Sequence, residues 1–346
     1  MPETGLLTAN HRMKNVLQYL VFLGLAAGLT WYAIHSGTIN PEQLWADVSQ
    51  ADFRWVGVMM LLTFVAHGSR AARWRILLEP LGYHPSFLRT NTAVWLGYFA
   101  NNLVPRLGEV TRCSALYKSD AIPIEKSLGT VVTERIFDVL SLFILLGINL
   151  LLDFDRLLAF IQRSTSATPD SESGVPVLIW IVLGLLIAGG LTVFFLWERL
   201  LELAIVKKLA KAGQGLLAGL LSIRKLRQPG LFLFYTVMIW GMYYVMGYVL
   251  FFAIPKFADL SPLVALTIMT TGALAMILPT PGGVGSYNAF VAFALHSIYE
   301  LPEADSGTLA TFIQSSQMLS TLAIGLVFLV ISVISRPSRK AVVSQS

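Results

Sequence analysis

The chain has 346 residues, of which 55% are hydrophobic and only 13% are charged. Soluble domains carry about 25% charged residues, so this composition excludes an ordinary soluble domain and indicates an all-α polytopic membrane protein. The formal net charge of +5 does not indicate nucleic-acid binding, because the basic residues lie in short segments between apolar stretches. A single cysteine, Cys113, excludes an internal disulfide and a CxxC metal site, and we expect neither a metal nor a cofactor.

Six apolar stretches are long enough to cross a bilayer, since a span needs about 20 apolar residues. They are 15–35, 55–78, 127–152, 175–197, 231–254 and 308–335. The first is too long for a signal-peptide core and lacks a convincing cleavage site, so we expect it to remain as a span.

Three further segments connect or follow these spans. Residues 153–174 are predicted to form an outer loop, and residues 336–346 a cytoplasmic tail. The segment 199–226 has a basic face and a leucine-rich face, so we expect an amphipathic helix on the inner leaflet. A plain solvated linker is the alternative for this segment.

Two more apolar regions, 88–118 and 263–299, are interrupted by proline and glycine. The interruptions align, because Pro105, Gly108 and Val110 have the same spacing as Pro279, Gly282 and Val284. Proline and glycine break helices, and irregular backbone at membrane depth is tolerated only against protein or a cavity. Each region is therefore predicted to be a re-entrant hairpin of two half-helices.

The loop charges support this layout. If both hairpins are re-entrant, the Lys and Arg clusters all fall on one side, which the positive-inside rule assigns to the cytoplasm together with both termini. The chain then consists of two units of span-span-hairpin-span, residues 1–152 and 175–335. Three full spans separate the hairpins, so the units are predicted to form an inverted repeat, as in alternating-access carriers.

Charged residues inside a membrane are costly and are candidates for function. The first unit supplies the candidate substrate-binding residues Asn101, Asn102, Arg106, Glu109, Arg112, Glu134, Arg135 and Asp138. Guanidinium groups bind phosphate through a bidentate fork, so we expect the arginines to contact a lipid phosphate. The alternative is structural: Glu109 pairs with its neighbouring arginines, and the acidic residues brace the hairpin. Arg70, Arg73 and Arg75 are interpreted as interfacial anchors.

The second hairpin is almost uncharged, and its glycines allow close backbone approach. Its candidate substrate-binding residues are Pro279, Gly282, Gly283, Gly285, Tyr287 and Asn288. Freed N–H groups at the start of a half-helix are able to bind an anionic group. We therefore expect the first hairpin to bind the headgroup charge and the second to admit the lipid.

Four stretches form a distinctive set: Arg70-Ala71-Ala72-Arg73-Trp74, the run from Asn101 to Arg112, Glu134-Arg135-Ile136-Phe137-Asp138, and the run from Pro279 to Gly285. Together they resemble the transmembrane region of lysylphosphatidylglycerol synthases, a family of flippase-like membrane proteins with stand-alone members. The resemblance covers about residues 15–335. It implies lipid translocation rather than aminoacyl transfer, since only a short tail follows Arg336. Many relatives carry a glutamate where this chain has Ser286-Tyr287-Asn288, so a substrate other than lysylphosphatidylglycerol is expected.

The leading hypothesis is a flippase for a phospholipid or a polyprenyl-phosphate lipid in a bacterial or archaeal cytoplasmic membrane, without enzymatic activity. One alternative is a glycosyltransferase that uses a polyprenyl-phosphate sugar, with Asp153 and Asp155 as its candidate pair. Another is a non-transporting scaffold of envelope lipid synthesis. Candidate partners are the lipid, an envelope lipid-modifying enzyme and a second copy of the chain as a homodimer. No nucleic acid is expected.

Overall fold

The computed structural model describes residues 39–165, 226–278 and 280–334, with scattered residues between 24 and 37. The expected span 175–197, the linker 199–226, the tail 336–346 and most of the span 15–35 lie outside the described residues. Within the described ranges the chain is all-helical, without strands. It divides into two compact units: residues 1–146 with 226–346, and residues 147–225.

The first unit begins with a short helix and a long helix, each started by a side-chain cap. Asn40 accepts backbone hydrogen bonds at the start of α2 (Pro41–Ser49), and Asp52 does the same for α3 (Phe53–Leu78). Such caps satisfy N–H groups that have no partner inside the helix. A turn of 3-10 helix, η1 (Glu79–Leu81), ends α3 at Gly82, which has a φ of 83°.

The first broken region forms α4 (Phe87–Leu103) and α5 (Leu107–Asp120), which fold back against each other. The chain leaves α4 at Val104 in an extended conformation, and Arg106 then has a φ of 66°. This left-handed conformation is unfavourable for a side chain with a Cβ, by about 1–2 kcal/mol. The Oδ1 atom of Asn101 accepts a hydrogen bond of 2.8 Å from the N–H of Gly108, which ties the two half-helices together at the break.

Glycine is required where α4 crosses α5. A Cβ added to Gly97 would lie 2.9 Å from the carbonyl oxygen of Gly108, and a Cβ on Gly108 would collide with the carbonyl oxygen of Gly97. A backbone oxygen has no side-chain freedom with which to move aside. The two half-helices therefore approach more closely than any other residue type would allow.

The second broken region has the same order of elements. Helix α12 (Pro262–Ala275) ends before the turn η5 (Pro281–Gly283), and α13 (Ser286–Tyr299) follows and packs against α12. Gly282, Gly283 and Gly285 have φ values of 57°, 74° and 82°, which glycine adopts without steric cost. Pro279 lies outside the described residues.

Long helices flank both broken regions. Helix α6 (Ile124–Leu152) follows the first, and α11 (Pro229–Val249) with the turns η3 (Leu250–Ala253) and η4 (Pro255–Phe257) precedes the second. Helix α14 (Glu303–Ile334) follows the second. Ile124–Leu152, Pro229–Ala253 and Glu303–Ile334 are long and apolar enough to cross a membrane. Helix α3 is about 39 Å long at 1.5 Å per residue, so it too exceeds a hydrocarbon core of about 30 Å, although its arginines lower its hydropathy.

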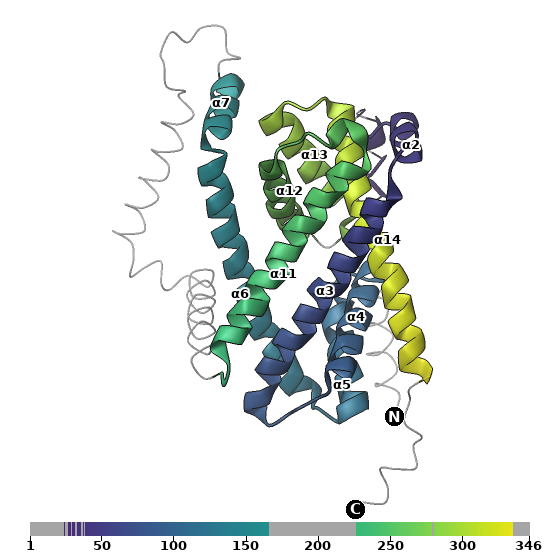
Figure 1. Cartoon of the computed structure of the whole chain (residues 1–346), viewed down its shortest axis with the longest axis vertical. Coiled ribbons are helices and arrows are strands. Elements are labelled where there is room, and N and C mark those ends of the chain that lie inside the picture. The colour runs from purple at the N-terminus through teal and green to yellow at the C-terminus, as the bar shows by residue number, and fades with distance from the viewer. Residues whose placement is uncertain are drawn as a thin grey trace, which may run out of the picture. The chain divides into compact units, whose positions relative to one another are not determined.

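In the first unit α3 packs along α11, and α14 packs against α4 and α13 (Figure 1). The order of long helix, broken pair and long helix thus occurs twice, as α3–α6 and α11–α14. Buried apolar side chains from α3, η3, α12, α13 and α14 form the main hydrophobic core. This core holds the second broken pair against the flanking helices.

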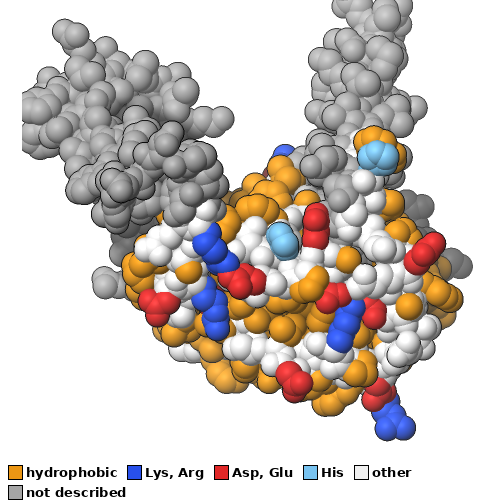
Figure 2. All heavy atoms as spheres, turned by 90° about the horizontal axis from the view of Figure 1, so that it is seen from above, with side chains coloured by type: hydrophobic (Ala, Val, Ile, Leu, Met, Phe, Trp, Pro, Cys, Tyr) orange, Lys and Arg blue, Asp and Glu red, His pale blue; other side chains and the backbone are white. Residues whose placement is uncertain are grey.

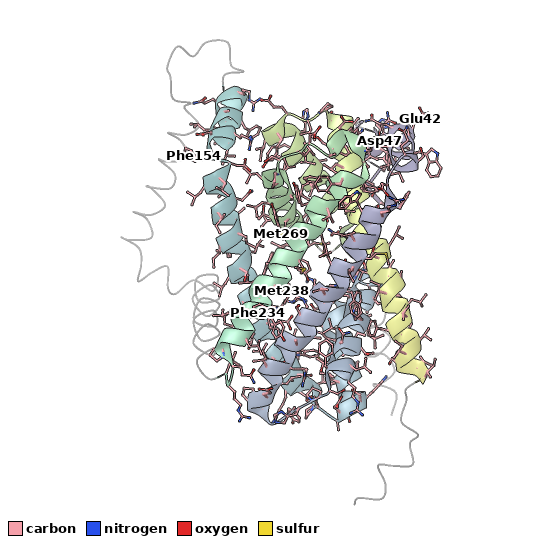
Figure 3. The ribbon with its side chains drawn as sticks, viewed as in Figure 1. Glu42, Asp47, Phe154, Phe234, Met238 and Met269 are labelled. Carbon is pink, nitrogen blue, oxygen red and sulfur yellow. The ribbon has the colours of Figure 1, made fainter. Side chains whose placement is uncertain are left out.

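One end of the first unit carries α2, η4 and the start of α14. Glu42 and Asp47 project from α2 there (Figure 3), and the view onto this end has acidic side chains scattered among hydrophobic ones (Figure 2). Lys256 pairs with Asp47 and, at 2.8 Å, with Asp305. Burial opposes the charge of Lys256, but hydrogen bonds from its ammonium group to Asp305 and Asp47 outweigh this and raise its pKa.

The second unit contains the end of α6 and helix α7 (Phe154–Thr165). The sequence predicted an outer loop over 153–174, but α7 shows that the first half of that segment is helical. Asp153 is buried and its Oδ1 atom accepts a 2.7 Å hydrogen bond from Arg156.

Candidate functional site

A buried cluster of ion pairs joins three helices of the first unit. Glu134 of α6 is fully buried, and its Oε1 atom lies 2.6 Å from Arg70 Nη1 and 3.2 Å from Arg73 Nη2. Its Oε2 atom accepts a 3.1 Å hydrogen bond from Arg112 Nη1. Asp138, one helical turn further on, lies 2.8 Å from Arg70 and 2.6 Å from Arg73. The cluster therefore connects α3, α5 and α6.

Aromatic rings surround the buried arginines. The guanidinium carbon of Arg112 lies 4.7 Å from the centre of the Trp74 ring, and that of Arg73 lies 5.6 Å from the Phe232 ring. Such cation–π contacts stabilise a charge that has been removed from water. Because both arginines are at least 97% buried, they serve as structural cations behind the surface of the site.

A second ion pair, between Arg135 and Glu109, is less buried than the cluster. Arg135 Nη2 donates to Glu109 Oε1 at 2.7 Å, and Arg135 Nη1 lies 3.5 Å from Asp138. The Arg135 side chain is 43% exposed, in contrast to the fully buried Arg73. This ion pair links α6 to the first turn of α5, directly after the break.

A cavity of ≈ 670 Å³ lies in the first unit beside these charges and is lined by both broken regions. The first break contributes Asn101, Asn102, Pro105, Arg106 and Glu109. The second contributes Met276, Ile277, Leu278, Thr280, Gly282 and Gly283. One cavity therefore has the two interrupted segments, about 175 residues apart in sequence, on its wall.

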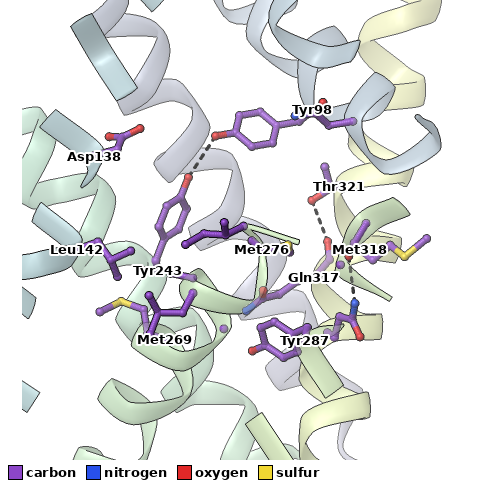
Figure 4. A pocket seen from close by; sticks show the side chains of 18 of the residues that line it. Tyr98, Asp138, Leu142, Tyr243, Met269, Met276, Tyr287, Gln317, Met318 and Thr321 are labelled. Carbon is purple, nitrogen blue, oxygen red and sulfur yellow. Dashed lines mark hydrogen bonds between the residues drawn. The ribbon is translucent and has the colours of Figure 1, made fainter. Parts of the chain in front are cut away.

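The cavity wall combines charged and polar side chains with many apolar ones. The charged and polar side chains include His67, Arg70, Tyr98 and Tyr243, and the hydroxyl groups of the two tyrosines lie 3.5 Å apart (Figure 4). Apolar side chains also line the cavity, among them Leu142 of α6, Met269 of α12 and Met318 of α14 (Figure 4). A cavity with both charged and apolar lining fits an amphipathic ligand.

Contacts of α14 hold the second break in place. Gln314 Nε2 donates a 3.0 Å hydrogen bond to the carbonyl oxygen of Gly282. The hydroxyl groups of Thr280 and Ser286 lie 2.7 Å apart across the turn. A Cβ on Gly272 would collide with the Tyr287 ring, so the absence of a side chain at this position lets that ring lie flat against α12. The irregular backbone of the turn is thus held by side-chain partners.

The structure places most of the sequence-predicted site residues on the cavity wall and the others behind or beside it. Asn101, Asn102, Arg106, Glu109, Arg135, Asp138, Gly282, Gly283 and Tyr287 line the cavity. Arg112 and Glu134 lie behind its wall, in the ion cluster. Gly285 shapes the turn through its positive φ, and Asn288 lines a separate small cavity of ≈ 280 Å³. Glu109 pairs with Arg135 rather than with Arg106 or Arg112.

Sequence reasoning did not find several residues of this site. Arg70 and Arg73 were interpreted as interfacial anchors, but they are buried and bind Glu134 and Asp138. The available signal was their spacing of three residues, which complements the four-residue spacing of the two carboxylates on a helix face. His67, Tyr98 and Tyr243 carried no distinguishing signal in the sequence. Arg75, in contrast, donates to the carbonyl oxygen of Pro85 outside the cluster.

Comparisons with known proteins match the chain to one family model and to parts of several individual proteins. The family model described as the lysylphosphatidylglycerol synthase TM region matches residues 16–325. A UPF0104 membrane protein of Methanocaldococcus jannaschii is 37% identical over 71 residues, which are 20% of this chain and 21% of that protein. A UPF0104 membrane protein of Pyrococcus horikoshii is 26% identical over 136 residues, 38% of this chain and 39% of the relative.

A further partial match is to the glycosyltransferase AglD of Haloferax volcanii. It is 24% identical over 131 residues, which are 38% of this chain and 21% of that protein. The matched regions thus span 39% or less of the length of each of these three relatives. No solved structure matches the chain.

Proposed function

Because this chain belongs to the lysylphosphatidylglycerol synthase transmembrane-region family of multi-pass membrane proteins, we propose that it moves a phosphate-containing lipid between leaflets. The observation that carries the proposal is one cavity lined by both broken regions, whose lining includes arginines and many apolar side chains. Substrate sites of many carriers lie between discontinuous helices of two repeats.

In this proposal the two breaks form the two sides of one substrate site. Arg106 and Arg135 bind the lipid phosphate, while Glu109 and Asp138 hold Arg135 in position. The apolar side chains of the cavity receive the start of the lipid tail. Arg70, Arg73 and Arg112 keep the carboxylates of the buried cluster fixed rather than contacting the lipid.

The proposed transport cycle is alternating access. The repeated order of long helix, broken pair and long helix supports an inverted repeat, in which the hairpins open to opposite faces and both termini lie in the cytoplasm. Exposure of the cavity then alternates as one broken pair moves against its flanking helices. The proposed location is the cytoplasmic membrane of an archaeon or bacterium.

A reconstitution assay tests the proposal. Proteoliposomes that contain fluorescently labelled phospholipid should show exchange between leaflets, measured by chemical quenching of the outer leaflet. Arg106→Gln should slow this exchange about tenfold or more, because losing about 1.4 kcal/mol of headgroup binding is a factor of ten. Arg106 is the substitution of choice because it is exposed and, among the described residues, takes part in no ion pair.

Arg54→Gln is the matched control. Arg54 is also an exposed arginine, but it lies at the start of α3 and does not line the cavity. The Arg54→Gln variant should therefore exchange lipid at the wild-type rate. Exchange that is equal in wild type, Arg106→Gln and protein-free vesicles would remove the basis of the proposal.

We propose no catalytic step. The glycosyltransferase alternative depended on Asp153 and Asp155, and Asp153 is engaged in an ion pair with Arg156. The similarity to AglD concerns 21% of that protein. Loss of lipid glycosylation in Asp153→Asn, with lipid exchange intact, would favour the enzyme. Retained cellular function after neutralising Arg106 and Arg135 would favour a scaffold.

A further inference from the structure

The charged groups in and directly behind the cavity wall do not balance. The arginines are Arg70, Arg73, Arg106, Arg112 and Arg135, and the carboxylates are Glu109, Glu134 and Asp138. Five cations thus face three anions. Among the described residues that line the cavity there is no further acidic group. With histidine counted as neutral, the site carries two positive charges in excess.

The excess charge is accessible from the cavity. Arg106 lies at the tip of the first broken pair, exposed and without an ion pair among the described residues. Arg135 is partly exposed and is held by carboxylates on one side. Both guanidinium groups line the same cavity, so a ligand that enters it meets two positive groups.

The second broken region offers no ion-pair partner to a positively charged headgroup. Residues 262–299 contain no Asp, Glu, Lys or Arg. The side chains that this segment turns toward the cavity include Met269, Met276 and Tyr287. The carboxylates that line the cavity, Glu109 and Asp138, are already paired with Arg135 and Arg70. The ammonium group of a zwitterionic or cationic headgroup would have to compete with these arginines, which is costly in a site partly removed from water.

Resting on the function proposed above, we infer that this cavity selects lipids with a phosphate monoester headgroup over lipids with a phosphate diester. A phosphate monoester carries about 1.5 to 2 negative charges at pH 7, which matches the excess of two, whereas a diester carries only one. Its additional terminal oxygen also allows bidentate contacts with both guanidinium groups.

The apolar lining of the cavity accommodates the tail without specifying it. Met246, Met269, Met276 and Met318 line the cavity, and methionine is flexible and polarisable enough to adapt to different chains. The selected chemistry is therefore a phosphate monoester on an apolar tail, whether isoprenoid or acyl.

Binding to the full chain in detergent micelles, measured by calorimetry, tests the inference with two probes of identical tail. Farnesyl phosphate should bind at least about tenfold more tightly than farnesyl methyl phosphate, because one unit of headgroup charge is lost in a partly enclosed site. In Arg106→Gln the preference should fall to about threefold or less, and in Arg54→Gln it should be unchanged. Equal affinity of wild type for the two probes would overturn the inference.

Inorganic phosphate separates a lipid site from a general anion site. It should bind at least about a hundredfold more weakly than farnesyl phosphate, because it lacks the tail that contacts the apolar lining. Equal affinity for the two would refute a lipid site. If the protein prefers the monoester but exchanges no lipid in proteoliposomes, the headgroup preference stands and the transport function is refuted. If it exchanges phosphatidylglycerol but binds both farnesyl probes equally, the transport function stands and the headgroup preference is refuted.

Discussion

Replacement of Glu134 by glutamine is the sharpest test of the buried ion cluster. Glu134 is fully buried and lies within 3.2 Å of guanidinium nitrogens from Arg70, Arg73 and Arg112. Glutamine keeps the shape of the side chain and one acceptor oxygen but removes the charge. The substitution therefore leaves three buried arginines with Asp138 as their remaining carboxylate in the cluster core.

The expected cost is large. Two unit charges 4 Å apart attract by about 4 kcal/mol at an effective dielectric of 20, and Glu134 has three such partners. The cost of removing the carboxylate from water offsets part of this attraction. Breaking a buried ion pair by removing one partner costs about 3–5 kcal/mol, and we expect Glu134→Gln to lower the free energy of unfolding by that amount.

Unfolding in mixed micelles of a mild detergent and sodium dodecyl sulfate, followed by circular dichroism, measures this cost. Asp120→Asn is the matched control, because Asp120 pairs at 2.9 Å with the exposed Arg89 and should lose about 1 kcal/mol or less. If both substitutions cost less than about 1 kcal/mol, the cluster is not the electrostatic link between α3, α5 and α6 that its geometry indicates.

A second substitution separates charge from packing. In the Glu134→Gln background, Arg112→Met removes one of the unneutralised cations while keeping an apolar side chain against Trp74. The loss of unfolding free energy in the double variant should be smaller than the sum of the losses in the two single variants, by a coupling energy of about 1 kcal/mol or more. Strict additivity would mean that Arg112 and Glu134 do not interact.

Two further predictions concern movement and pH. In a Cys113→Ser background, Phe99→Cys with Gly325→Cys should form a disulfide that locks α4 to α14 and stops lipid exchange until reductant is added. A Cβ on Gly325 would lie 2.9 Å from that of Phe99, so a small outward shift brings the pair to the separation of about 3.5–4.5 Å that a disulfide needs. Exchange that persists after complete oxidation would contradict movement between these helices. Lys256→Met should lower the free energy of unfolding by about 1 kcal/mol or less. Because the pKa of Lys256 is raised in the folded protein, its contribution is complete below the ordinary lysine value of about 10.4 and disappears as the pH rises through the folded value. Thermal unfolding from pH 7 to 11.5 measures this, and a wild-type advantage that grows with pH would refute the ion pair to Asp305.

Local patterns in the sequence were sufficient to predict the long helices, although α2 and α7 were not predicted. The expected spans 55–78, 127–152 and 308–335 correspond to Phe53–Leu78, Ile124–Leu152 and Glu303–Ile334. The helices are longer than the apolar stretches because their first turns contain polar residues, which a search for apolar residues leaves out. The two interruptions were also predictable, because proline and glycine act on the backbone within a few residues. The pseudo-two-fold relation of the two units remains a prediction.

The sequence by itself determined the membrane class, the helical elements, the two breaks and the presence of unusual charges between residues 106 and 138. Only the tertiary structure decided which charges are neutralised and which face a ligand. Arg70 and Glu134 are 64 residues apart, and their pairing depends on which faces of α3 and α6 meet. Arg106 and Arg112 look alike in sequence, but helix packing buries one behind Trp74 and leaves the other on the cavity wall. Contacts between distant segments have no local signature, so the composition of the cavity followed only from the packed helices.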